Sequence, residues 1–294
     1  MTHKPTVSGV IFDIFNHIFL VCVFILMLYP FLYVINYSFS TPAYVKNTLL
    51  LWPVGFNLES YQVLFKDSTI WNALGVSIAR SVIGPLLMLV VSAMAAFALK
   101  KQDLVFGRFF RLFFLATMYF SAGIIPVYLT YQMYGLTNTF WVYIWPGVVN
   151  VFNMVLIRTY MEGLPASLEE AVLIDGGNDI DAFRRVVLPL CLPVSAAVFM
   201  FSCVGHWNSY IDTQFYNAMD QELYTLQYVL YNAMAVQLSK SLEEARTATQ
   251  SSVQLTGQSL KMAITVITVV PIACVYPMLQ KYFVSGLLVG SIKA

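Results

Sequence analysis

Residues 163–189 read GLPASLEEAVLIDGGNDIDAFRRVVLP, a polar stretch that separates two of the long apolar runs making up most of the chain. It contains a helical pattern on each side of a glycine pair, Gly176 and Gly177. Glycine adopts positive φ without strain, so this pair is expected to end the first helix. The stretch therefore predicts a helix, a glycine turn and a second helix between two longer elements.

Both short helices carry signals for their ends. Ser167, followed three residues later by Glu170, matches a capping box, in which each side chain accepts a bond from the backbone N–H of the other residue. Glu169 and Glu170 also stand at the positive end of the helix dipole. Asn178 or Asp179 is expected to cap the second helix. The expected inward faces are Leu168, Ala171, Val172 and Ile174 in the first helix and Ala182, Phe183, Val186 and Val187 in the second.

The composition of the 294-residue chain is that of a membrane protein, with 59% hydrophobic and 11% charged residues. Soluble domains carry about 25% charged residues, so this chain has too few charges to cover a water-facing surface. The apolar content also excludes an intrinsically disordered protein. The net charge of +1 provides no overall field that would attract nucleic acid.

Six apolar runs are long enough, at roughly 20 residues each, to cross the hydrocarbon core of a bilayer. They lie at about 14–36, 71–99, 112–132, 140–157, 188–210 and 262–280. Pro189 and Pro193 are expected to break the entry into the fifth run. The sequence thus predicts an all-α, polytopic membrane protein with six transmembrane helices in a single domain, residues 1–294. The four cysteines have no CxxC or Cys/His spacing, so no metal site is predicted.

The positions of Lys and Arg predict the orientation of these spans. With the N-terminus inside, ten of them fall in inner segments and five in outer ones, and Arg80 lies within a span. This excess favours both termini in the cytoplasm. The stretch 163–189 then lies on the cytoplasmic side, in an inner connection, 158–188, that holds six of the fifteen acidic residues.

The spacing within this inner stretch resembles the EAA loop of permease subunits of binding-protein-dependent ABC importers. The sequence Glu170-Ala171-Val172 is followed two residues later by Asp175-Gly176-Gly177, and then, after eight residues, by Val186-Val187-Leu188-Pro189. Val172 and Gly177 stand where that family usually has alanine. Further similarity to the carbohydrate branch, which includes the maltose permease, lies in Ile125-Pro126, 135–139, Leu164-Pro165, Trp207-Asn208 and the tail from Lys281 to Lys293. The tail and the length look most like permeases for alginate or rhamnogalacturonan fragments.

This resemblance implies a permease subunit without enzymatic activity, in a bacterial plasma (inner) membrane. The loop 163–189 would contain a cytoplasmic coupling helix that docks on an ABC ATPase dimer, where ATP and Mg²⁺ are bound. A second homologous permease subunit and a substrate-binding protein would complete the complex, and the chain itself would need no cofactor. The residues expected to couple to the ATPase are Ser167, Glu169, Glu170, Ala171, Asp175, Gly176, Gly177 and Phe183. The chain contains no GxxxxGK[ST] phosphate-binding loop.

Polar side chains in the spans are candidates for a substrate path, because such groups avoid lipid. Arg80 is expected either to contact a sugar or to pair elsewhere, reaching the interface or a partner subunit. His206 is either a sugar contact or a structural hydrogen-bond donor. Trp207 and Trp145 either stack on sugar rings or anchor the membrane interface. The other candidates are Asn150, Asn153, Ser202 and Asn208.

Three alternatives stay open from the sequence. The first is an ABC permease for another solute, such as a peptide or an amino acid. The second is a self-sufficient secondary transporter, which would need ion-coupling carboxylates near the membrane midplane, where this chain has almost none. The third is a membrane scaffold, for which 163–189 is only a well-capped connector.

Overall fold

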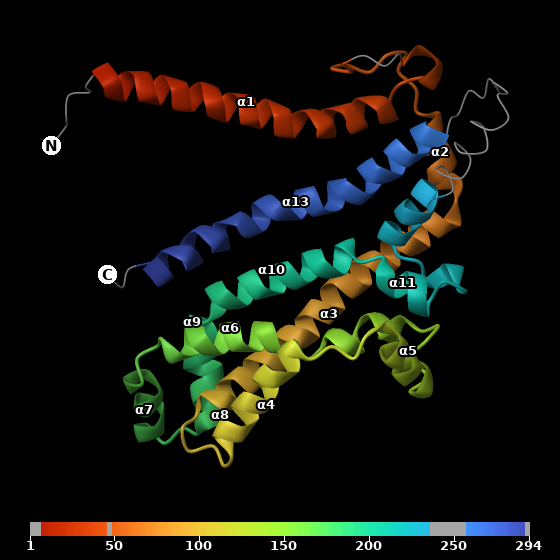
Figure 1. The fold of residues 1–294 in the computed structure, drawn as a ribbon. Helices are drawn as coiled ribbons and strands as arrows, with labels where there is room; N and C mark the ends of the chain where they lie inside the picture. The colour runs from red at the N-terminus through yellow and green to blue at the C-terminus, as the bar shows by residue number, and fades with distance from the viewer. Residues whose placement is uncertain (1–6, 46–48, 236–256, 292–294) are drawn as a thin grey trace. The chain divides into compact units, whose positions relative to one another are not determined.

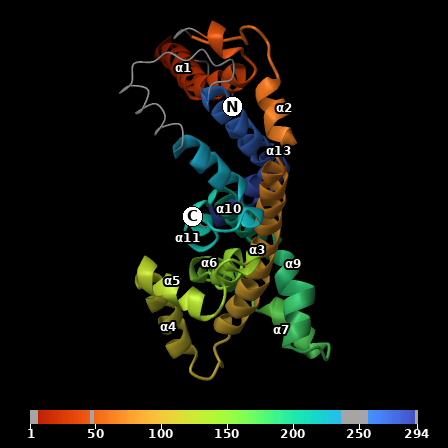
Figure 2. The ribbon, with the colours of Figure 1, turned by 90° about the vertical axis from the view of Figure 1, so that its right-hand side faces the viewer.

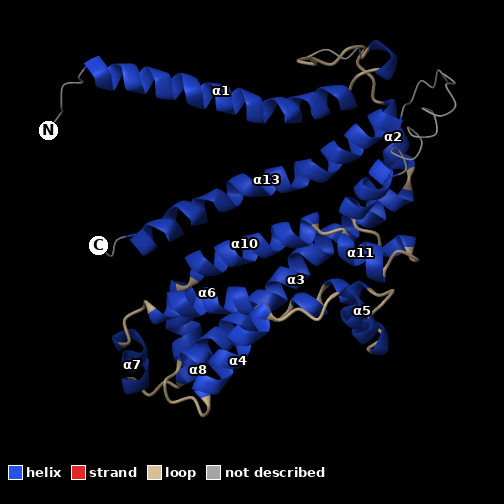
Figure 3. Ribbon diagram, viewed as in Figure 1, coloured by secondary structure: helices blue, strands red, loops and turns tan. Residues whose placement is uncertain are grey.

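The computed structural model describes residues 7–45, 49–235 and 257–291. Within these ranges the regular elements are helices, joined by loops and one isolated bridge between Ser40 and Phe56, and no strand is present (Figure 3). The α-helices are α1 Val7–Ser38, α2 Glu59–Lys66, α3 Ser68–Lys100, α4 Gly107–Tyr119, α5 Ile124–Met133, α6 Val151–Glu162, α7 Ser167–Ile174, α8 Asp179–Ala182, α9 Leu188–Leu190, α10 Leu192–Asn208, α11 Ile211–Tyr216 and α13 Gly257–Ser291. Short 3₁₀ segments are η1 Pro42–Tyr44, η2 Phe140–Tyr143, η3 Trp145–Gly147 and η5 Gln221–Leu223, and η4 Phe183–Val187 is a π-helix.

Three of the six expected spans are single helices. In the described part of the chain, α1, α3 and the segment Gly257–Cys274 of α13 are each long and apolar enough to cross a membrane. The runs 112–132 and 140–157, each predicted as one transmembrane helix, contain a break, and the run 188–210 is broken near its start. The bends are 115° between α4 and α5, 43° between Phe140–Gly147 and α6, and 74° between Asp179–Leu190 and α10. Counting each bent pair as one span gives up to six spans.

The break before α10 has the predicted cause. Pro189 lies in the first turn of α9 and Pro193 in the first turn of α10, with Cys191 between the two helices. Proline has no backbone N–H to donate and its ring collides with the preceding turn, so two prolines four residues apart favour a break at this point. The prediction that these prolines interrupt the fifth run is therefore confirmed.

The chain divides into two compact units, Met1–Asp67 with Asn232–Val269 and Ser68–Tyr231 with Val270–Ala294. In the first unit, the segment after α1 folds back on the end of that helix. The Asn36 side chain donates to the Leu50 carbonyl oxygen at 3.1 Å, and the hydroxyls of Ser38 and Tyr61 lie 2.8 Å apart. These bonds satisfy polar groups that would otherwise be buried without partners.

The second unit is built around α3, which packs against α6 and α10 (Figures 1 and 2). The contact surface of α3 includes small residues such as Ser92, Ala93 and Ala96, which let helices approach closely. The core beside them consists of Met88, Phe97, Leu99, Met154, Ile157, Met161, Val187, Cys191 and Val198. This packing fixes the ends of α6 and α10, from which the candidate site residues project.

Gly84 of α3 lies against the His206 side chain of α10. A Cβ atom at this position would lie 2.7 Å from Cε1 of His206. On its other side the imidazole lies against Gly147, with Nε2 3.6 Å from where a Cβ on that glycine would stand. The ring therefore fills the space between two glycines.

We expect Gly84→Ala to destabilise the protein by about 1–3 kcal/mol through overpacking against His206. Gly75→Ala is the matched control, because it lies on the same helix with no atom within 4 Å of the new Cβ. That control should stabilise slightly, since alanine favours a helix by about 1 kcal/mol over glycine. Thermal unfolding of the purified protein in detergent, followed by intrinsic fluorescence, measures both effects. Equal midpoints for the two variants would contradict this packing.

Candidate functional site

The segment from α7 to α8 has the predicted helix, glycine turn and helix. The N–H of Gly177 donates to the Val172 carbonyl oxygen at 2.9 Å, and the N–H of Gly176 donates to that of Leu173 at 3.1 Å. These two bonds form a Schellman motif, which requires a left-handed residue after the helix. Gly176 supplies it with a φ of +82°. At Gly177 a Cβ would lie 2.7 Å from Cγ1 of Val172 and collide with it. The backbone conformation at Gly176 and this close contact at Gly177 explain why glycine stands at both positions.

The expected capping box at Ser167 is wrong. The residue before α7 is Ala166, and no side chain caps the helix. The N–H groups of Leu168, Glu169 and Glu170 already donate to the carbonyl oxygens of Pro165 and Ala166. Because these upstream carbonyls satisfy the first turn, Ser167 lies inside the helix and its hydroxyl has no free N–H to accept from.

The second helix has the capping box instead. The Asn178 side chain accepts from the N–H of Asp181 at 3.0 Å, and the Asp181 carboxylate accepts from the N–H of Asn178 at 3.3 Å. Of the two residues predicted as the cap, Asn178 and Asp179, the structure uses Asn178. The predicted inward face of this helix is confirmed: Ala182 and Val187 are buried, and Phe183 packs on Phe97 of α3 with 5.0 Å between ring centroids.

Two lysines at the end of α3 contact the acidic side chains of this segment. The ammonium of Lys100 donates to Glu169, and both side chains are about 15% exposed. Lys101 lies 3.9 Å from Glu169 and 2.5 Å from Asp179. The sequence reasoning missed these lysines as site residues, although two adjacent cations after an apolar run were a visible signal.

The outer face of α7 is uncovered. The predicted inward face of α7 is wrong at most positions. Leu168, Ala171 and Ile174 are exposed, and only Val172 is half-buried. Ile174 is 85% exposed. Glu170 and Asp175 are exposed next to it. The described chain contains nothing that buries this mixed apolar and acidic surface.

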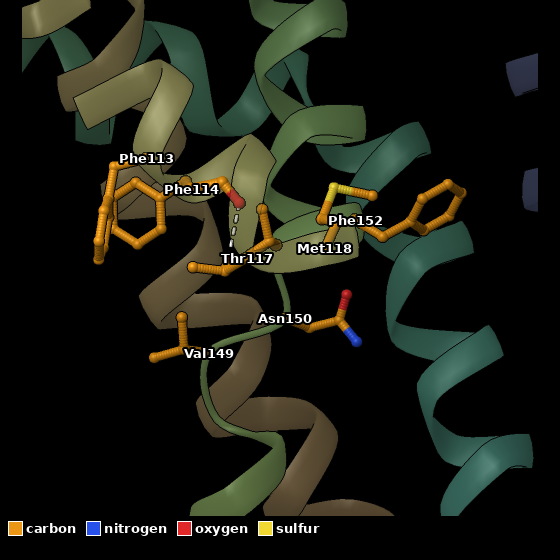
Figure 4. Close-up of a pocket in the computed structure, with 8 residues that line it drawn as sticks. Phe113, Phe114, Thr117, Met118, Val149, Asn150 and Phe152 are labelled. Atoms are coloured by element: carbon orange, nitrogen blue, oxygen red, sulfur yellow. Dashed lines mark hydrogen bonds between the residues drawn. The ribbon is translucent and has the colours of Figure 1, made fainter. Parts of the chain in front are cut away.

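An open cavity of about 550 Å³, most of whose lining residues are exposed, lies between α4 and the start of α6 (Figure 4). Its walls combine aromatic and aliphatic side chains with an amide and a hydroxyl, from Phe113, Phe114, Thr117, Met118, Val149, Asn150, Val151 and Phe152. Asn150 caps α6 by accepting from the N–H of Asn153 at 3.0 Å, which leaves its NH₂ group able to donate. Of the predicted path residues, only Asn150 lines this cavity. The aromatic residues of α4 were missed.

Arg80 has a partner that the sequence did not suggest. Its guanidinium is 1% exposed and donates to Asp212, and its Cζ lies 4.4 Å from the Tyr143 ring centroid. The Ser209 hydroxyl donates to the other oxygen of Asp212 at 2.8 Å. The expected outcomes for Arg80 were a sugar, the interface or another subunit, and the structure instead pairs it within the chain.

The remaining predicted path residues are dispersed. Asn153 donates to the Met88 sulfur at 3.4 Å, and Ser202 is half-buried. Trp207 is buried beside an apolar cavity of about 360 Å³ between α3, α10 and α13, and Asn208 is exposed at the end of α10. Their roles, and that of His206, stay predictions.

Comparisons with known proteins give a consistent result. The chain is 33% identical over 284 residues to the polygalacturonan/rhamnogalacturonan transport system permease protein YtcP of Bacillus subtilis, covering 96% of this chain and 98% of that protein. It is 35% identical to the B. subtilis protein LplC, with coverage of 99% and 98%. The diacetylchitobiose uptake permease NgcG of Streptomyces coelicolor is 26% identical, with coverage of 96% and 89%. No family profile matches the chain.

A solved structure agrees with these relatives. The crystal structure of a bacterial ABC transporter involved in the import of the acidic polysaccharide alginate contains a similar chain, with a TM-score of 0.85 and 28% identity. The match covers 96% of this chain and all of the other.

We expect Asp212→Asn to destabilise the protein more than Arg80→Met. The first change leaves a fully buried guanidinium unpaired, which costs about 3–5 kcal/mol. The second leaves a carboxylate that is 31% exposed and can reach water. The stability of the double variant should be close to that of Arg80→Met alone, because the buried guanidinium that Asp212→Asn leaves unpaired is absent from it. Unfolding midpoints of the three purified variants check this order, and additive losses would exclude a direct pair.

Proposed function

Because this chain belongs to the permease proteins of sugar ABC transport systems, we propose that it forms part of the membrane path of an ABC importer for an oligosaccharide. It acts as a single transmembrane domain, residues 1–294, in a bacterial plasma membrane. Six spans cross the bilayer, three of them as bent pairs, and both termini lie in the cytoplasm. The lysine and arginine distribution supports this orientation.

The complex contains partners that supply energy and substrate. An ATPase dimer hydrolyses ATP with Mg²⁺, a binding protein delivers the sugar, and a second permease subunit completes the path. This division of labour is supported by the chain's own sequence, which has no phosphate-binding loop. It is also supported by the relatives, whose names describe permease proteins of transport systems.

The uncovered face of α7 is the observation that carries this proposal. Ile174 is 85% exposed, and Leu173 is 47% exposed on a helix whose end is locked by the Schellman motif. Exposed apolar side chains rimmed by acidic ones mark a protein interface. We assign this face, with Glu170 and Asp175, to a groove of the ATPase that presents basic groups, since charge-assisted hydrogen bonds are strong.

The cavity beside Asn150 suits a sugar. Aromatic faces such as those of Phe113 and Phe152 pack on the apolar faces of sugar rings, while an amide bonds their hydroxyls. The backbone between η3 and α6 is irregular at residues 148–150. Irregular backbone at membrane depth is tolerated only where it is buried in protein or lines a water-filled cavity. We therefore place the sugar path along this wall.

A secondary transporter is the less favoured alternative. Ion coupling needs carboxylates inside the spans. In the described second unit, acidic groups stand at or beyond the ends of the span helices, as Glu162 does at the end of α6, and Asp212 just beyond α10 is already bound by Arg80 and Ser209.

We expect Glu170→Lys to release the ATPase from the complex, because the charge reversal places a cation opposite basic groups. The tagged chain is purified in mild detergent, and co-purifying subunits are identified and quantified. Sugar uptake should fall more than tenfold. A loss of about 1.4 kcal/mol in binding free energy lowers the amount of bound ATPase tenfold when the ATPase does not saturate the complex.

Glu222→Lys is the control, since it makes the same charge change on an exposed residue of η5. It should leave both the ATPase and uptake unchanged. A Glu170→Lys protein that retains its ATPase and wild-type uptake would show that α7 does not dock there.

We expect Asn150→Ser to raise the KM for uptake several-fold without changing thermal stability. Serine keeps the cap on α6 but removes the amide donors. Phe152→Leu should also raise the KM, whereas Phe109→Leu, a residue of α4 outside the cavity wall, should not. Uptake is measured with the best substrate from a panel of labelled oligogalacturonides, arabino-oligosaccharides and diacetylchitobiose. An unchanged KM in the first two variants would place the sugar path elsewhere.

A further inference from the structure

The position of α7 depends on charge more than on apolar packing. None of its eight residues is fully buried. Its most enclosed polar side chain is Glu169, which is 14% exposed and bound by Lys100 at the end of α3. A half-buried pair of this kind is less screened by solvent than a surface pair. The pair therefore sets where α7 lies relative to α3.

Lys101 extends this contact across the glycine turn. Its Nζ lies 3.9 Å from Glu169 of α7 and 2.5 Å from Asp179 of α8. The same ammonium lies 5.1 Å from the Phe97 ring centroid of α3. One cation thus links α3 to the helices on both sides of Gly176, so the segment from α7 to α8 is held to α3 as a unit.

The adjacent residues Glu169 and Glu170 have different surroundings. Glu169 points to the lysines of its own chain, whereas Glu170 is exposed on the face proposed for the ATPase. Both were predicted to couple to the ATPase, but only Glu170 is free to reach another protein. Glu169 has an internal partner instead.

From Lys100, α3 leads directly to the proposed sugar path. It is a 33-residue helix that packs along α6. Asn153 of α6 donates to the sulfur of Met88 on α3, and Asn153 is itself bound to Asn150 of the cavity wall. Twenty residues from Lys100, about 30 Å along the axis, Arg80 joins α3 to Asp212. A displacement of the lysine end therefore reaches both the cavity and the far end of the unit.

We propose that Lys100 and Lys101, with Glu169 and Asp179, form a positioning strut through which movement of α7 and α8 is passed to α3. This proposal rests on the proposed function, in which an ATPase moves α7. The strut adds an internal mechanical contact to that docking surface. Without it, α7 can follow the ATPase while α3 stays in place.

The test separates ATP hydrolysis from movement of the path. The full complex is purified with its ATPase subunits and reconstituted in nanodiscs, with the four native cysteines replaced and Thr117→Cys added at the cavity. The alkylation rate of this cysteine by a charged methanethiosulfonate reagent is compared with and without ATP and vanadate. In the parent complex, we expect the alkylation rate to change when ATP and vanadate trap the ATPase. In Glu169→Gln this change should shrink at least about fivefold, because the half-buried pair is worth at least as much as a strong surface pair, while bound ATPase and ATP hydrolysis persist.

Glu162→Gln is the matched control, since its ion pair with Arg158 lies within α6 and links no two elements. It should behave like the parent. Lys100→Met should reproduce the loss, and the double variant Lys100→Met with Glu169→Gln should be no worse than either single variant. A Glu169→Gln complex with the parent's full change in alkylation overturns the strut but leaves the proposed function intact. If no ATPase co-purifies with the parent chain, both the strut and the proposed function are overturned.

Discussion

The packing of α3 against α6 and α10 is the interaction on which the second unit depends. Small residues along α3 allow the close approach, and the ring of His206 fills the remaining gap between Gly84 and Gly147. Inside a bilayer there is little hydrophobic force between helices, so such fit and a few polar contacts must hold them together. The candidate path residues on α3, α6 and α10 lie on helices whose positions this contact fixes.

The scarce charges are placed where this packing ends. Lys100 stands at the end of α3 and binds the acidic segment, while Arg80 is buried and paired with Asp212. An unpaired charge at either point would be costly in a low-dielectric surrounding. Both of these pairs join elements that are far apart in the sequence.

The helix breaks also follow from the membrane as a solvent. Free backbone groups cannot face lipid, so bends are confined to places lined by protein or water. The bend before α6 borders a cavity with an amide and aromatic walls, and the bend before α10 lies between two prolines. The first is the place for a sugar in the proposed importer, and the second connects the ATPase-facing segment to a span.

The sequence by itself determined the features that depend on local chemistry: the apolar runs, the turn at Gly176, the Asn178 cap and the break at Pro189. It failed at Ser167, because carbonyl oxygens just upstream satisfied the N–H groups that a cap would have bound. Only the tertiary structure decided the partners of the charges. Asp212 lies 132 residues from Arg80 and Glu169 lies 69 from Lys100, and no local pattern encodes such a pairing. Helix packing brings these groups together, and the cost of burying a lone charge then selects the pair.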